Sequence, residues 1–231
     1  MKGILILLFP MLLLAQSNFE KAKESFDIEK QERFQKQYEL ILKTDPDNVK
    51  ALEGLGDIAG FNKSWDKAVQ YYGKLKTVKP SEANFYYKYG GSLGMKALEV
   101  NKFRALGLIG DIKSSFEKAI QLDSRHIDAR WALIELYLKL PSIVGGSESK
   151  AIEYSNQLLT LSIVDGYLSR GHIEEYYDRF KSAENYYKKA ITVGGSKHSY
   201  QTLANLYKNK MDAPDKARTI LEQYKEKNTV N

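Results

Sequence analysis

Residues 52–80 read LEGLGDIAGFNKSWDKAVQYYGKLKTVKP, and this stretch decides the fold. Gly56 and Ala68 are small residues that let two helices approach closely, and Tyr72 can fill the space beside them. The same residue types recur at a distance of 34 positions in the pairs Tyr38 and Tyr72, Ile41 and Leu75, Pro46 and Pro80, and Gly56 and Gly90. A period of this length is typical of a repeated helix–turn–helix unit, which buries its apolar face against the next unit.

The pattern returns further along the chain. Residues 187–191 (YKKAI) repeat residues 116–120 (FEKAI) almost residue for residue, and breaks such as Asp45–Asn48 separate the units. The spacing predicts an all-α fold, a right-handed α-solenoid of about six antiparallel helix pairs. We expect one domain of this kind over residues 16–225 and a polar tail over residues 226–231.

With these residues the chain resembles the tetratricopeptide-repeat (TPR) superfamily over nearly all of residues 16–225. The loop Leu140–Ser147, followed by Lys150 and Ala151, resembles a subgroup of exported bacterial repeat proteins that includes periplasmic accessory components of substrate transporters. The superfamily resemblance implies a protein that holds extended peptides or partner helices on a concave surface, lined by the first helix of each pair.

The first residues have the layout of a secretory signal peptide. Lys2 supplies a positive charge, residues 3–15 are almost wholly apolar, and the small residue Ala15 precedes a polar segment from Gln16. The apolar run is shorter than the ~20 residues that a membrane-spanning helix needs, and Pro10 disfavours a straight helix. We expect export to the periplasm or beyond, with residues 1–15 removed; the alternative is an N-terminal membrane anchor.

Composition and charge exclude several function classes. The chain contains no cysteine, so disulfides, thiol catalysis and cysteine-based metal sites are excluded. The net charge is only +6, and no basic cluster is interleaved with aromatic residues, so nucleic acid is not an expected partner.

No residue set indicates catalysis, a cofactor or a metal. His126 lies between Asp123 and Asp128 at a predicted helix boundary, where a helix-capping role explains it better than a metal does. Gly145–Ser147 could bind an anion at a helix start, but it lacks the phosphate-loop pattern, and a capping Ser147 explains it.

The segment between Gly94 and Gly110 makes the third repeat longer than the others and is unusually apolar. One interpretation is two long helices packed tightly through the glycines Gly90, Gly91, Gly94, Gly107 and Gly110. The other is a protruding helix pair that lines a binding pocket or covers one end of a groove.

Candidate binding residues follow from helix geometry. Trp131, Glu135 and Lys139 are spaced by four residues, so they share one helix face, away from the apolar Leu133 and Tyr137. The equivalent faces of other repeats contribute Tyr87, Met95, His172, Tyr176 and Asn205. Aromatic residues with few charges suit a peptide or an amphipathic ligand. Trp131 could instead fill a gap in the core.

The sequence therefore predicts an exported, non-enzymatic scaffold that binds a protein or peptide partner of the cell envelope along its concave face. The alternative is a periplasmic binding module for a small amphipathic or hydrophobic ligand, possibly serving a transporter. That alternative expects a closed apolar cavity lined by Leu106, Ile109, Trp131 and Met95.

Overall fold

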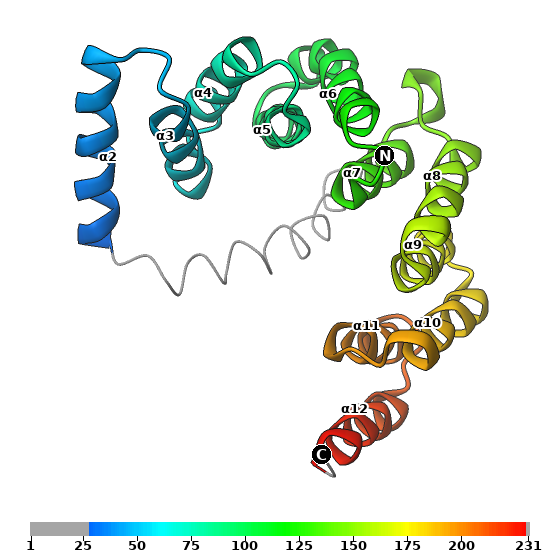
Figure 1. Cartoon of the computed structure of the whole chain (residues 1–231). Helices are drawn as coiled ribbons and strands as arrows, with labels where there is room; N and C mark the ends of the chain where they lie inside the picture. The colour runs from blue at the N-terminus through cyan, green and yellow to red at the C-terminus, as the bar shows by residue number, and fades with distance from the viewer. Residues whose placement is uncertain (1–27, 230–231) are drawn as a thin grey trace. The chain divides into compact units, whose positions relative to one another are not determined.

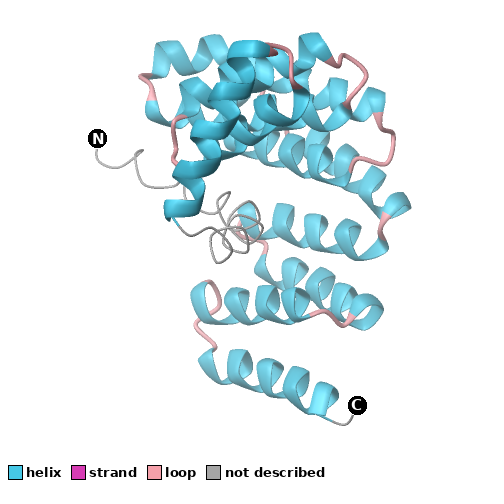
Figure 2. Cartoon of the chain, turned by 60° about the vertical axis from the view of Figure 1, so that its left-hand side comes forward, coloured by secondary structure: helices cyan, strands magenta, loops and turns pink. Residues whose placement is uncertain are grey.

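The structure, a computed structural model, describes residues 28–229. Within this range the chain forms eleven α-helices and one short 3-10 helix, with no β-strand (Figure 2). The all-α prediction is confirmed. The expected signal peptide and its boundary at Ala15 lie outside the described residues.

Two compact units divide the chain between Ala129 and Arg130. The described part of the first unit holds α2 (Ile28–Thr44), α3 (Val49–Phe61), α4 (Trp65–Val78), α5 (Ala83–Glu99) and α6 (Lys102–Leu122) (Figure 1). The second unit holds most of α7 (Ile127–Lys139), then η1 (Ser142–Val144), α8 (Glu148–Leu161), α9 (Ile163–Tyr176), α10 (Phe180–Gly194), α11 (Lys197–Asn209) and α12 (Pro214–Thr229). Helix α12 extends beyond residue 225, where the sequence predicts the end of the repeat domain.

Each of three helix pairs closes where an aromatic ring covers a glycine of the preceding helix. A Cβ atom built at Gly56 would lie 2.7 Å from the ring of Tyr72, which is closer than any real contact allows. The same relation joins Gly90 to Phe116 and Gly171 to Tyr187, at 2.9 Å and 2.4 Å. The small residue is therefore required, because a side chain there would push the two helices apart.

Local signals set the helix ends of the decisive stretch. Asn48 accepts a hydrogen bond from the backbone N–H of Ala51 and caps α3. The turn at residues 62–64 separates α3 from α4, as the sequence predicts, and Lys63 adopts a left-handed conformation with φ of 55°. Asp178 and Asp212 adopt similar angles in the corresponding turns after α9 and α11. The repeats thus share turn geometry as well as packing.

The long third repeat combines features of both expected arrangements. Helices α5 and α6 contain 17 and 21 residues. Tight packing through five glycines is wrong for four of them, because a Cβ at Gly91, Gly94, Gly107 or Gly110 would meet nothing within 4 Å. Phe103 and Leu106 are 88% and 45% exposed, so Leu106 does not line a closed cavity. The insert is exposed because its apolar residues find too few neighbouring helices to cover them.

Ala68 tests the assigned register of the helix pair. It is fully buried in the cluster formed by Leu52, Ala59, Tyr72, Leu75 and Phe85. Ala68→Leu should lower the free energy of unfolding by ~1–3 kcal/mol, because the added atoms overfill a packed interior. Urea unfolding followed by circular dichroism measures this change. Lys67→Leu places the same side chain at an exposed position and serves as the control; equal effects of the two substitutions would contradict the register.

Candidate interaction site

The predicted row on α7 meets α9 in the second unit, where three charged side chains come together. Glu135 is buried, with 6% of its surface exposed. Its Oε1 atom lies 2.6 Å from Nε2 of His172, and its Oε2 atom lies 3.3 Å from Nζ of Lys139. We call Glu135, Lys139 and His172 the charged triad. The structure therefore joins residues from two repeats, which the sequence places only on equivalent faces of separate helices.

Trp131 borders the charged triad. Its indole N–H donates a hydrogen bond of 3.0 Å to Oδ1 of Asp165, and its ring centroid lies 6.3 Å from that of His172. The ring is half-buried and packs against the apolar cluster that includes Leu168 and Leu203. Trp131 thus takes part in the core and also forms one edge of the row, so neither interpretation from the sequence holds alone.

Burial and ion pairing act in opposite directions on the triad. Burial by itself raises the pKa of Glu135, but His172 and Lys139 outweigh it and hold that pKa at about 2. For His172, burial favours the neutral ring, yet the Glu135 carboxylate raises its pKa above the ordinary value. The pKa of Lys139 is lowered, because burial destabilises its ammonium more than the Glu135 carboxylate stabilises it. Glu135 therefore stays ionised, and His172 holds its proton at higher pH than a free histidine.

Sequence reasoning missed two participants in this network. Asp165 receives the indole N–H of Trp131, and Glu175 accepts a hydrogen bond of 2.8 Å from the Tyr187 hydroxyl. The repeat period could have revealed Asp165, which follows Trp131 by 34 residues. In the first unit, Trp65 likewise donates to Glu99, 34 residues later, over 2.7 Å. A tryptophan followed one repeat later by an acid is a signal that could have been found in the sequence.

No family model and no curated protein matches the sequence. Solved structures do match: a TPR protein from Parabacteroides merdae ATCC 43184 aligns with a TM-score of 0.62 and 15% identity, covering 90% of this chain and 77% of that one. PilW, a type IV pilus biogenesis factor, gives 0.59 at 17% identity, covering 95% and 94%. YrrB, a TPR protein with an unusual peptide-binding site, gives 0.53 at 16% identity, covering 79% and 86%. The chain has the TPR fold.

The remaining predicted residues of the chain lie in different surroundings. Tyr176 is 44% exposed and follows His172 by one turn of α9, and Asn205 is exposed on α11. In the first unit, Met95 is half-buried, and the ring of Tyr87 lies 6.0 Å from Phe116 and 5.1 Å from His126. Burial, with a smaller effect of Asp128, raises the pKa of Tyr87 to about 12. Tyr87 therefore packs against neighbouring rings, and its role in binding stays a prediction.

The capping roles predicted for two sequence motifs are confirmed. Nδ1 of His126 accepts a hydrogen bond from the backbone N–H of Ala129, and Ser147 accepts one from that of Lys150. Among the described residues, no group of three or more acidic, histidine or cysteine side chains could hold a metal ion.

The triad should make stability depend on pH in a defined direction. Because the folded-state pKa of His172 is raised, its contribution is complete below the unfolded pKa of ~6.5 and is lost as pH rises through the folded value. Glu135 contributes above its unfolded pKa of ~4.3 and loses that contribution as pH falls toward about 2. Urea unfolding should therefore show His172→Gln to be more destabilising at pH 5.5 than at pH 9.

His198→Gln provides a control with the opposite sign. Partial desolvation by neighbouring residues lowers the pKa of His198, an exposed side chain, with Asp165 opposing, so removing that imidazole should be relatively less harmful at pH 5.5 than at pH 9. If the free energies of unfolding of the wild type and of the His172→Gln variant changed in parallel with pH, the proposed pairing of Glu135 with His172 would be contradicted.

Proposed function

We propose that this protein is a non-enzymatic interaction module that binds an extended segment of a partner protein on the α7–α9 face, formed by Trp131, Glu135, Lys139, His172 and Tyr176. The observation that carries this proposal is the incomplete pairing of the charged triad. Glu135 Oε2, Lys139 Nζ and His172 Nε2 are buried, yet none makes a well-aligned hydrogen bond within the described residues, despite their ion-pair contacts.

A peptide is the ligand chemistry that suits this face. An ammonium carries three N–H donors, and Lys139 makes one carboxylate contact, so a turn of its 14% exposed side chain toward solvent presents the remaining donors to an incoming acceptor. A buried polar group without a partner costs about 1–3 kcal/mol, so a ligand that supplies the missing hydrogen bonds gains affinity. A peptide backbone offers such acceptors at regular intervals, and the rings of Trp131 and Tyr176 offer apolar surface for its side chains.

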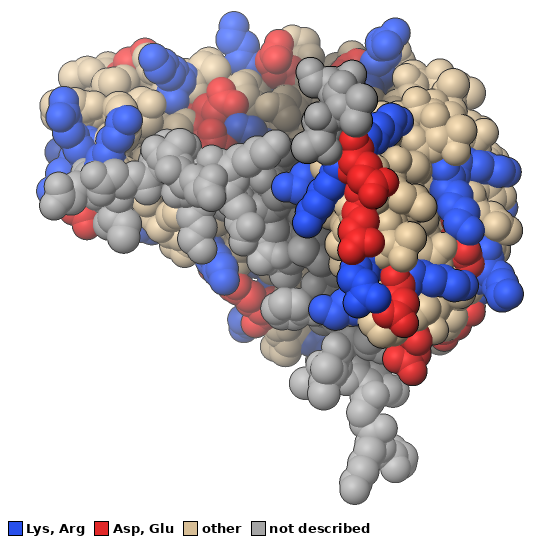
Figure 3. All heavy atoms as spheres, turned by 90° about the horizontal axis from the view of Figure 1, so that it is seen from below, with Lys and Arg blue, Asp and Glu red and all other residues tan. Residues whose placement is uncertain are grey.

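The charge distribution supports a protein partner over a nucleic acid. On the face drawn in Figure 3, lysine and arginine side chains alternate with aspartate and glutamate over the atoms that are not grey. A mixed surface of this kind lacks the one-sided basic field that binds phosphate backbones. The TPR fold of YrrB, described with a peptide-binding site, is consistent with this choice.

We also propose export to the cell envelope, where the partner would be found. The support is the sequence of residues 1–16, with Lys2, the apolar run and Ala15 before Gln16. Within residues 28–229, no helix combines the length and apolar character that crossing a membrane requires.

The α7–α9 face can be tested by photo-crosslinking in cells. A benzoylphenylalanine in place of Tyr176 should form a crosslink to a partner protein, and adding Trp131→Ala should abolish it, because truncating a central aromatic anchor costs about 2 kcal/mol or more of binding. The control places the same crosslinker at Phe103, an exposed aromatic of the first unit. Circular dichroism must show that Trp131→Ala keeps its helices. Crosslinks from position 103 but none from position 176 would contradict this face.

Export has a separate test. N-terminal sequencing of the protein isolated from whole cells should find a mature chain that begins near Gln16, outside the cytoplasm. A cytoplasmic chain that retains Met1 would refute export and leave the α7–α9 proposal standing.

A further inference from the structure

A second surface of the same unit has the properties of a ligand site. Helices α8, α9 and α10 enclose a groove of about 420 Å³, which we call the α8–α10 groove. Its walls combine apolar and aromatic side chains with two polar ones: Ile152, Leu159, Tyr167, Tyr186, Asn156 and Arg170. Tyr167 and Arg170 lie about half a turn away from His172 around α9, so this groove is separate from the α7–α9 face.

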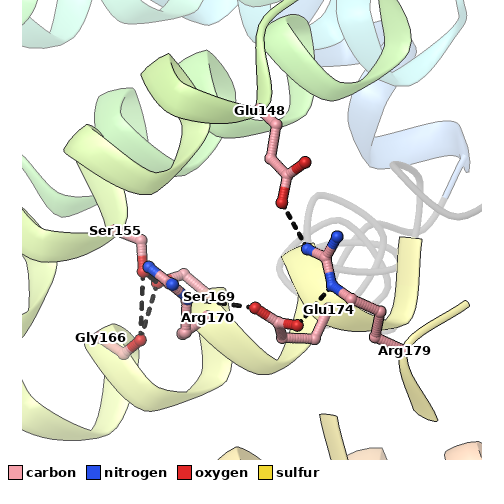
Figure 4. Close-up of polar contacts among 7 residues, drawn as sticks. All are labelled: Glu148, Ser155, Gly166, Ser169, Arg170, Glu174 and Arg179. Atoms are coloured by element: carbon pink, nitrogen blue, oxygen red, sulfur yellow. Dashed lines mark hydrogen bonds and ion pairs between the residues drawn. The ribbon is translucent and has the colours of Figure 1, made fainter. Parts of the chain in front are cut away.

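The floor of the groove is rigid. A Cβ built at Gly166 would lie 2.4 Å from Cα of Leu159, so α9 can approach α8 this closely only with glycine there. The hydroxyl of Ser169 lies 2.9 Å from that of Ser155 and 3.0 Å from the carbonyl oxygen of Gly166 (Figure 4). These buried contacts fix the two helices and leave the groove preformed, which lowers the entropic cost of binding.

The rim of the groove is positively charged and only partly neutralised. Nζ of Lys189 lies 5.7 Å and 5.2 Å from the ring centroids of Tyr167 and Tyr186, and it makes no ion pair with any described residue. Arg170 contacts the Tyr186 ring as well and shares the carboxylate of Glu174 with Arg179 (Figure 4). Two cations thus face the groove beside aromatic surface, and only the arginine is paired with a carboxylate of the described chain.

The equivalent groove of the first unit differs in how its lysine is paired. Tyr71 and Lys74 hold the repeat positions of Tyr186 and Lys189, and they line a smaller groove of about 210 Å³. There Lys74 forms an ion pair of 3.1 Å with Asp47. In the first unit a carboxylate of the chain itself pairs with the lysine, whereas in the second unit no carboxylate of the described residues does so.

We propose that the α8–α10 groove binds an acidic–hydrophobic peptide, a partner segment in which Asp or Glu stands next to an aliphatic side chain. The carboxylate takes the role that Asp47 plays in the first unit and pairs with Lys189 and Arg170. The aliphatic side chain packs against Ile152 and Leu159 beside the two tyrosine rings, whose centroids lie 6.5 Å apart. The amide of Asn156 can pair with the peptide backbone, which offers both a donor and an acceptor.

A random heptapeptide library displayed on phage tests this site directly. Selection on the immobilised full-length chain should enrich peptides with Asp or Glu beside Leu, Ile or Val. Lys189→Glu, an exposed substitution, should lower the affinity of the synthesised peptides at least tenfold and shift a new selection toward Lys or Arg at the same peptide position. Lys74→Glu makes the same charge change in the first-unit groove and should leave affinity unchanged, as should Tyr176→Ala on the α7–α9 face.

Each alternative outcome overturns the proposal. Selection of peptides without an acidic residue, or no enrichment at all, rules out the ligand class. Acidic peptides that bind Lys189→Glu as well as the wild type, or that lose affinity with Lys74→Glu or Tyr176→Ala instead, assign the binding to another surface. Because the α7–α9 face is tested by its own crosslink, failure at the α8–α10 groove does not bear on the function proposed for that face.

Discussion

The contact between a glycine and an aromatic ring of the next helix is the constraint on which the rest of the structure depends. Where Tyr72 covers Gly56, and again where Tyr187 covers Gly171, no other residue would let the helix axes come as close. The same tyrosines then use their hydroxyl groups, since Tyr72 donates to Asp57 and Tyr187 to Glu175. One residue therefore closes the helix pair and at the same time orients a carboxylate of the preceding helix, which is how repeat packing becomes coupled to surface chemistry.

The charged triad shows this coupling at its strongest. Removing ions from water is costly, and removing one partner of a buried pair typically costs about 3–5 kcal/mol, because the other charge is left alone. Replacing the whole triad by apolar side chains would avoid the cost of burying ions, and the neighbouring positions 133 and 134 hold Leu and Ile. The triad lies at the junction of two repeats with hydrogen-bonding capacity left over, which is the capacity that we propose a ligand uses.

The two units also show how a repeat protein diversifies without changing its fold. The same tyrosine and lysine positions occur in both grooves, but Asp47 neutralises the lysine of the first, while the second holds Lys189 in a larger space with no ion pair to the described residues. The long α5–α6 pair illustrates the opposite case. Its extra apolar residues lengthen two helices, but no further helix of the described chain packs against them, so Phe103 remains exposed to solvent.

Much of the fold could be predicted from sequence because its determinants are local or strictly periodic. The breaks at Asp45–Asn48 and Asn62–Ser64, the cap at Ser147 and the buried positions Ala68 and Tyr187 all follow from spacing along the chain. The row of Trp131, Glu135 and Lys139 was also predicted, since residues four apart share a helix face. Only the tertiary structure decided that His172 lies within 2.6 Å of Glu135, that Trp131 bonds to Asp165, and that four of the five glycines in the long repeat face open space. These features depend on distances between helices of different repeats. Side-chain size and orientation set those distances, and periodicity alone does not specify them.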